Sequence, residues 1–81
     1  MPIGVEHYIG GWQAHFDSPH NHHHIHAYVE YLADGYACAG CSIDGISVYY
    51  NTDHHFIDVS PEGLASIIEH VTGINVEVYV F

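Results

Sequence analysis

The sequence predicts a small α+β fold, with two helices packed on one face of a largely antiparallel sheet in the order ββαβββαβ. Three observations predict it: short runs of alternating apolar residues, glycine-containing pairs between such runs, and two Ser-Pro steps that precede apolar residues at helical spacing. With 81 residues the chain has the length of one domain, and we expect residues 1–81 to form a single α+β domain.

The first two strands are predicted at residues 5–9 and 12–16. Both runs alternate between apolar and polar residues, and Gly10-Gly11 lies between them. A two-residue, glycine-containing connection is typical of a β-hairpin, because glycine adopts the positive φ angles that tight hairpin turns require. We therefore expect these two strands to pair.

The next segment, residues 19–34, is predicted to be a helix. Ser18 is a suitable N-cap, Pro19 fits the first helical position, and Gly35 fits a C-terminal cap. Apolar residues recur at helical spacing, namely Ile25, Tyr28, Val29 and Leu32. A strand is the alternative, because alternate positions are also occupied by Ile25, Ala27, Val29 and Tyr31.

Further strands are predicted at residues 36–43, 46–51 and 54–59, with a terminal strand at 76–80. Asp44-Gly45 joins the first two as a second hairpin. The second helix begins at Ser60-Pro61 and ends at Gly73. Its apolar stripe has i, i+3, i+4 and i+7 spacing and consists of Leu64, Ile67, Ile68 and Val71.

The charge composition is the most unusual property of the chain. It has no lysine or arginine, ten histidines and ten carboxylates, which gives a formal charge of −10 at pH 7. Binding to nucleic acid or to an anionic membrane at neutral pH is disfavoured, because lysine and arginine supply most of that attraction. Histidine titrates near pH 6.5, so we expect a pH-responsive surface.

The histidines also predict how stability changes with pH. Imidazoles surrounded by unpaired carboxylates are expected to have raised pKa values in the folded chain. Histidines with raised pKa values in the folded chain stabilise the fold when they are protonated. Their contribution to the free energy of unfolding is complete below about pH 6.5 and is lost as the pH rises to about 8.

A histidine-rich segment is the first candidate metal site. On a helix, His22 and His26 are one turn apart, as are His20 and His24, and Glu30 continues the row. Neutral imidazoles at this spacing can chelate Zn²⁺, Ni²⁺ or Cu²⁺. The candidate ligands are His20, His22, His23, His24, His26 and Glu30. The alternatives are a solvated face without function and the relic of an internal affinity tag.

A possible second metal site combines Cys38, Cys41, His54 and Asp58. Two small, half-buried thiols are the alternative that the sequence favours, followed by a disulfide or redox pair. A catalytic arrangement would use either cysteine as nucleophile, His54 or His55 as base and Asp58 as orienting group. In a strand, however, His54 and Asp58 would be about 13 Å apart. We therefore expect no enzyme activity and, without a glycine-rich phosphate loop, no organic cofactor.

Three functions remain open from the sequence. The first is a non-enzymatic protein whose histidine-rich surface binds divalent metal ions. The second is an engineered variant of a nucleic-acid-binding domain in which lysine and arginine were removed, since Ile46 and Ile74 follow turns where a polar residue is usual. The third is an acidic decoy that binds a basic protein partner, and the seven tyrosines offer a surface for such a partner.

The composition yields a direct test with nucleic acid. Without metal, we expect negligible binding to duplex DNA or RNA at pH 7.5, and salt-sensitive binding only below about pH 6, where most imidazoles are charged. Fluorescence anisotropy at both pH values, with a chelator present, measures it. Tight binding at pH 7.5 would contradict the expectation.

Overall fold

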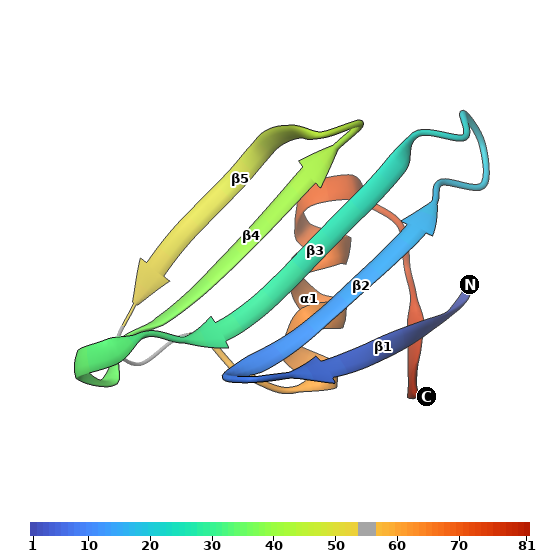
Figure 1. The fold of residues 1–81 in the computed structure, drawn as a ribbon. Coiled ribbons are helices and arrows are strands. Elements are labelled where there is room, and N and C mark those ends of the chain that lie inside the picture. Colours follow the sequence, from blue (N-terminus) through green and yellow to red (C-terminus); the bar gives the residue numbers. More distant parts are fainter. Residues whose placement is uncertain (54–56) are drawn as a thin grey trace.

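The computed structural model describes residues 1–53 and 57–81, which form a six-stranded sheet, a short 3-10 turn and one α-helix (Figure 1). In chain order the elements are β1 (Pro2–Tyr8), β2 (Gly11–Asp17), β3 (His24–Tyr31), the 3-10 turn (Ala33–Gly35), β4 (Ala37–Ile43), β5 (Ile46–Asp53), α1 (Pro61–Thr72) and β6 (Glu77–Val80). None of the described helical residues form a segment long and apolar enough to cross a membrane.

The strands lie side by side in the order β5-β4-β3-β2-β1-β6. Neighbouring strands are antiparallel, except that β6 runs parallel to β1. α1 contacts β2, β3, β4 and β6 and therefore covers one face of the sheet (Figure 1). A strand that follows a helix can pair in parallel with an earlier strand, because the helix returns the chain across the sheet.

The predicted fold with two helices in the order ββαβββαβ is wrong, because β3 occupies the segment expected to form the first helix, residues 19–34. Ile25, Ala27 and Val29 are at most 2% exposed, and the residues between them point to the other face. β3 is paired along its whole length with β2 and β4, so its backbone groups have partners on both sides. The alternating pattern therefore predicted this segment correctly, and the helical spacing did not.

The Ser18-Pro19 step starts a tight loop over residues 18–23. The amide of Ser18 donates a hydrogen bond to the carbonyl of His23 at 2.9 Å, and the amide of His22 donates to the carbonyl of Ser18 at 3.1 Å. His22 adopts a left-handed φ of 56°. Gly35, expected to cap the helix, lies in the 3-10 turn that follows β3, with a φ of 80°.

The strand predicted at residues 54–59 is also corrected. Residues 54–56 lie outside the described residues, and residues 57–59 have no regular secondary structure. β5 instead extends to Asp53, two residues beyond its predicted end.

Both predicted hairpins are confirmed. Tyr8 pairs with Gly11, so the first turn consists of Ile9-Gly10 and begins one residue earlier than expected. Gly11 belongs to β2, where a Cβ atom would lie 2.0 Å from the carbonyl oxygen of Val29. The second turn is Asp44-Gly45, with φ angles of 52° and 81°, as a type I′ turn requires.

α1 is confirmed with both of its predicted caps. The hydroxyl of Ser60 accepts a hydrogen bond from the amide of Gly63 at 3.0 Å, and Pro61 occupies the first turn. At the other end, Gly73 adopts a φ of 75° and its amide donates to the carbonyl of Glu69 at 2.8 Å. These contacts satisfy backbone groups that the helix leaves unpaired at its ends.

The core lies between α1 and the sheet. Leu64 and Ile68 of α1 are fully buried against alternating residues of four strands. In the middle of the sheet these residues are small: Ala14, Ala27, Ala39 and Cys41. Small side chains at these positions leave room for the larger side chains of the helix, and the close packing fixes how α1 lies on the sheet.

Gly63 makes the first turn of α1 a sensitive test of this packing. A Cβ atom there would lie 1.8 Å from the carbonyl oxygen of Asp58. Although alanine favours helix by about 1 kcal/mol over glycine, we expect Gly63→Ala to lower the free energy of unfolding by about 2 kcal/mol because of this clash. Urea denaturation measures it, with the exposed Ser66→Ala as the control. Equal or greater stability of Gly63→Ala would contradict this packing.

Candidate functional site

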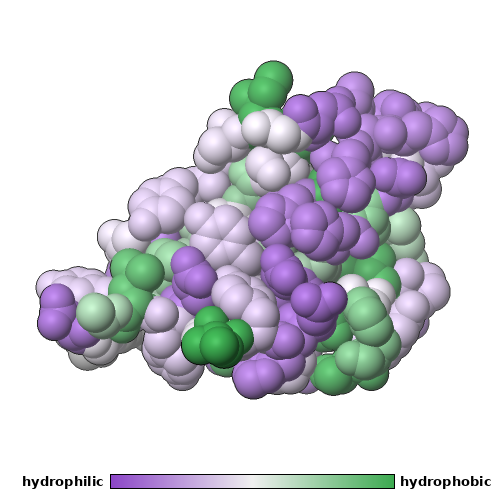
Figure 2. All heavy atoms as spheres, in the orientation of Figure 1, coloured by the Kyte–Doolittle hydropathy of each residue, from purple (hydrophilic) through white to green (hydrophobic). Residues whose placement is uncertain are grey.

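The face of the sheet opposite α1 carries polar and aromatic side chains, and we call it the open face. Gln13 pairs with Tyr28, His15 with His26, and Asp17 with His24. These pairs alternate with buried pairs such as Ala14 and Ala27, so they lie on the opposite face. In Figure 1 the strands lie in front of α1, and the same view in Figure 2 shows a band of hydrophilic residues across the open face.

Three imidazoles gather at the end of β2 and β3 on the open face. The ring centroids of His15 and His26 are 4.1 Å apart with an interplanar angle of 10°, and those of His15 and His24 are 5.5 Å apart at 24°. The ring of Tyr28 continues the row, with its centroid 5.9 Å from the ring centroid of His26. Cross-strand neighbours on one face lie close enough for such ring contacts. We call His15, His24 and His26 the histidine cluster.

Hydrogen bonds fix the orientation of the histidine cluster. The Nδ1 of His15 and the Nε2 of His24 are 3.3 Å apart. Asp17 Oδ1 lies 3.3 Å from His24 Nδ1, and Gln13 Oε1 lies 3.2 Å from His26 Nε2. One consistent proton arrangement has His24 donate from Nδ1 to Asp17 and accept at Nε2 from His15.

Partial burial, followed by the neighbouring imidazoles, lowers the pKa of His26. Its partial burial disfavours the charged imidazolium first, and the neighbouring His15 and His24 act in the same direction. For His26 this is the opposite of the raised pKa that the composition predicted. The titratable groups that act on His26 are the imidazoles of His15 and His24, and not the carboxylates that the composition suggested.

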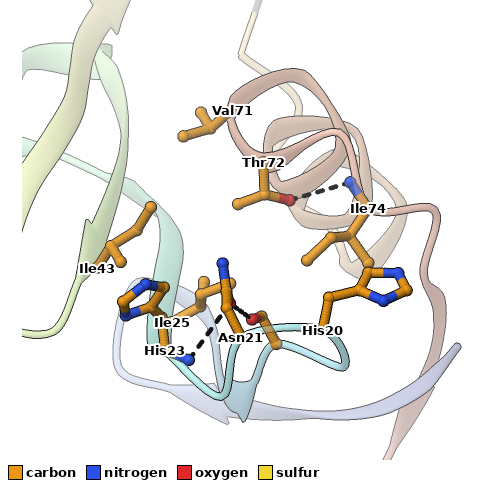
Figure 3. A pocket seen from close by; sticks show the side chains of 9 residues that line it. His20, Asn21, His23, Ile25, Ile43, Val71, Thr72 and Ile74 are labelled. Carbon is orange, nitrogen blue, oxygen red and sulfur yellow. Dashed lines mark hydrogen bonds between the residues drawn. The ribbon is translucent and has the colours of Figure 1, made fainter.

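The loop over residues 18–23 is attached to the second hairpin turn by Asp44. Asp44 accepts a hydrogen bond from the amide of His24 at 2.9 Å and lies 2.5 Å from the Nδ1 of His23. The hydrogen bond from the His24 amide, followed by the contact with the His23 ring, lowers the pKa of the Asp44 carboxyl group. His20 and His23 also stand at the rim of a pocket between this loop and the end of α1 (Figure 3).

The helical pairing of the first predicted metal site is wrong, because its residues lie in a loop and a strand. His20, His22 and His23 are in the loop, and only His24, His26 and Glu30 lie on β3. In a strand, residues four positions apart are separated by about 13 Å, so His26 and Glu30 are too distant to share an ion. Of the six predicted ligands, only His24 and His26 belong to the histidine cluster.

Glu30 belongs to a separate group at the other end of the open face. The hydroxyl of Tyr8 donates a hydrogen bond to Glu30 Oε2 at 2.9 Å, and the thiol of Cys38 lies 3.4 Å from Glu30 Oε1. Burial, followed by the contact with Glu30, raises the pKa of Cys38 to about 11 and also raises the pKa of Tyr8. Cys38 is therefore a protonated thiol at neutral pH, which is a poor nucleophile and metal ligand.

The second predicted metal site is not brought together by the described residues. Cys38 and Cys41 are both buried and form no disulfide. They lie three positions apart on β4 and therefore point to opposite faces, with Cys41 in the core. Asp58 lies before α1, where its carboxylate accepts from the hydroxyl of Ser60. His54 and His55 lie outside the described residues.

His15 and Asp17 were not among the site residues predicted from the sequence. Both follow the alternation of β2, which places them on the open face, but their neighbours depend on the register between β2 and β3. Within residues 1–53 and 57–81, no group of three or more histidine, cysteine, aspartate or glutamate side chains is arranged to hold a metal ion.

Comparison with known proteins assigns no relative to this chain: no protein-family model, curated protein or solved structure matches it.

The lowered pKa of His26 predicts a pH effect on stability. A histidine whose folded-state pKa is lowered contributes stability that is complete above about pH 6.5 and is lost as the pH falls. We therefore expect His26→Gln to reduce the fall in melting temperature between pH 7.5 and pH 5. The control is His20→Gln in the exposed loop, which should behave as the parent chain does. An unchanged pH profile in His26→Gln would contradict the assigned cause.

Proposed function

We propose that this protein is a non-enzymatic binding protein that holds a divalent transition metal ion between His15 and His24 on the open face. The observation that supports this proposal is the separation of 3.3 Å between His15 Nδ1 and His24 Nε2. Zinc–nitrogen bonds of about 2.05 Å at a tetrahedral angle place two ligand nitrogens about 3.3 Å apart. Two imidazoles at this spacing need only a rotation of their rings to direct both lone pairs at one ion.

Asp17 adds the second element of a histidine metal site. Histidines that bind metals usually donate their other ring N–H to a carboxylate, which fixes the tautomer and increases the basicity of the ligand. Asp17 stands at 3.3 Å from the Nδ1 of His24 and leaves Nε2 for the ion. The ion would replace the proton between the two rings, while His15 carries its own proton on Nε2.

The net charge favours a cation at this position. The formal charge is −10 at pH 7, and no lysine or arginine competes with the ion for carboxylates. Because two imidazoles supply only part of a coordination shell, water would complete it. Among Zn²⁺, Ni²⁺ and Cu²⁺, imidazole ligands bind Cu²⁺ most strongly.

The two other functions inferred from the sequence have less support. A row of rings on a sheet can stack nucleic-acid bases, but the chain has no permanently charged cation to bind the phosphates. A basic protein partner fits the negative charge of the chain, which by itself marks no particular position for binding. Neither alternative has a specific contact that favours it over metal binding.

Calorimetric titration with Zn²⁺ or Ni²⁺ tests the proposed site. We expect His15→Ala and His24→Ala each to weaken binding by tenfold or more, and Asp17→Asn to weaken it by about tenfold because the tautomer is no longer fixed. The control is the double variant His20→Ala/His22→Ala, which removes two exposed imidazoles of the loop and should leave the affinity unchanged. Equal losses in the control, or tight binding without both His15 and His24, would contradict the site.

A further inference from the structure

A pocket of about 250 Å³ lies between the loop over residues 18–23, the sheet and the C-terminal end of α1 (Figure 3). It is separate from the histidine cluster, because neither His15 nor His24 lines it. Its volume is just below the range of about 300–1,000 Å³ for pockets that bind small molecules. A ligand for this pocket must therefore be small.

Aliphatic side chains form most of the wall of the pocket. Ile25 and Ile43 come from β3 and β4, and Val71 and Ile74 come from the end of α1 and the residues after it. Figure 3 shows these four side chains around one space. The apolar part of a ligand would gain free energy from burial against them.

Hydrogen bonds within the loop orient the side chain of Asn21. Its Oδ1 accepts hydrogen bonds from the hydroxyl of Ser18 and from the amide of His23. Ser18 is only 5% exposed, and its backbone is bonded to His23 and His22, so the loop around Asn21 is well anchored. Because both donors lie at Oδ1, the amide nitrogen of Asn21 must point the other way.

The Nδ2 group of Asn21 points into the pocket. In Figure 3 it faces the space between Ile43, Val71 and Thr72. The contacts of this side chain among the described residues are those at Oδ1, and Asn21 is exposed, so Nδ2 lies at the open mouth of the pocket. The hydroxyl of Thr72, which also lines the pocket, is already engaged, because it donates to the carbonyl of Ile68 and accepts from the amide of Ile74. Asn21 therefore offers an oriented donor beside an apolar wall.

We propose that this pocket binds a small, uncharged amphipathic molecule through a carbonyl oxygen that accepts a hydrogen bond from Asn21 Nδ2. Its apolar part would pack against Ile43, Val71 and Ile74. An anionic ligand is disfavoured, because the chain has a charge of −10 and no lysine or arginine. A ligand that only donates hydrogen bonds would make no hydrogen bond with Asn21 Nδ2, which is itself a donor.

Hexanamide is a suitable probe, since it combines a carbonyl group with a short aliphatic chain. In the presence of a chelator, titration followed by ¹H–¹⁵N NMR should shift the amide signals of residues 20–25, 43 and 71–74. Hexylammonium has the same chain but no acceptor and should leave these signals in place. Equal shifts with hexylammonium, or hexanamide shifts confined to other residues, would overturn the proposal.

Substitutions test the contributions of Asn21 Nδ2 and of the aliphatic side chains to binding one at a time. Asn21→Asp keeps the oxygen that accepts from Ser18 but removes the donor, and should weaken hexanamide binding about fivefold or more. Asn51→Asp on β5 introduces the same charge away from the pocket and should bind as the parent does. Val71→Thr has nearly the same shape with a polar group in the wall, and should also weaken binding.

Unchanged affinity in Asn21→Asp would overturn the proposed role of the donor, and unchanged affinity in both pocket variants would overturn the site. The spectra of residues outside the pocket report whether each variant is folded. Metal binding at His15 and His24 is measured separately, so failure of this proposal is distinguishable from failure of the proposed function.

Discussion

The rest of the structure depends on the two-residue alternation of β3 between β2 and β4. Ile25, Ala27 and Val29 are buried beneath α1, and this burial fixes which residues of β3 face the other side. A shift of one residue in register would move the apolar side chains to solvent, so the register is strongly specified. The same constraint places His24 and His26 on the open face, directly opposite Asp17 and His15.

The absence of fixed positive charge gives the histidines an unusual role in the electrostatics. In most proteins carboxylates are paired with lysine or arginine, but here Asp17 and Asp44 are in contact with His24 and His23. At the same time partial burial, followed by the neighbouring imidazoles of His15 and His24, lowers the pKa of His26.

The loop over residues 18–23 connects the two candidate sites. It begins where β2 ends and leads into His24, the first residue of β3 and a member of the histidine cluster. Its other side carries Asn21 and lines the pocket next to α1 (Figure 3). Asp44 bonds to both His23 and His24, so the position of this loop also depends on the turn between β4 and β5. The geometry of either site is thus tied to contacts between three segments that are distant in the sequence.

The sequence by itself determined the local features of this protein. The Asp44-Gly45 turn, the Ser60 and Gly73 caps of α1 and the first hairpin could be predicted, because each depends on the φ preferences or hydrogen bonds of a few adjacent residues. The charge and the abundance of histidine were also evident. Tertiary structure decided the rest. The segment over residues 19–34 fits both helical and alternating patterns, and the pairing of β3 with two neighbouring strands selected the strand. That choice brought His15 to His24, since contacts across strands depend on register, which no local pattern contains.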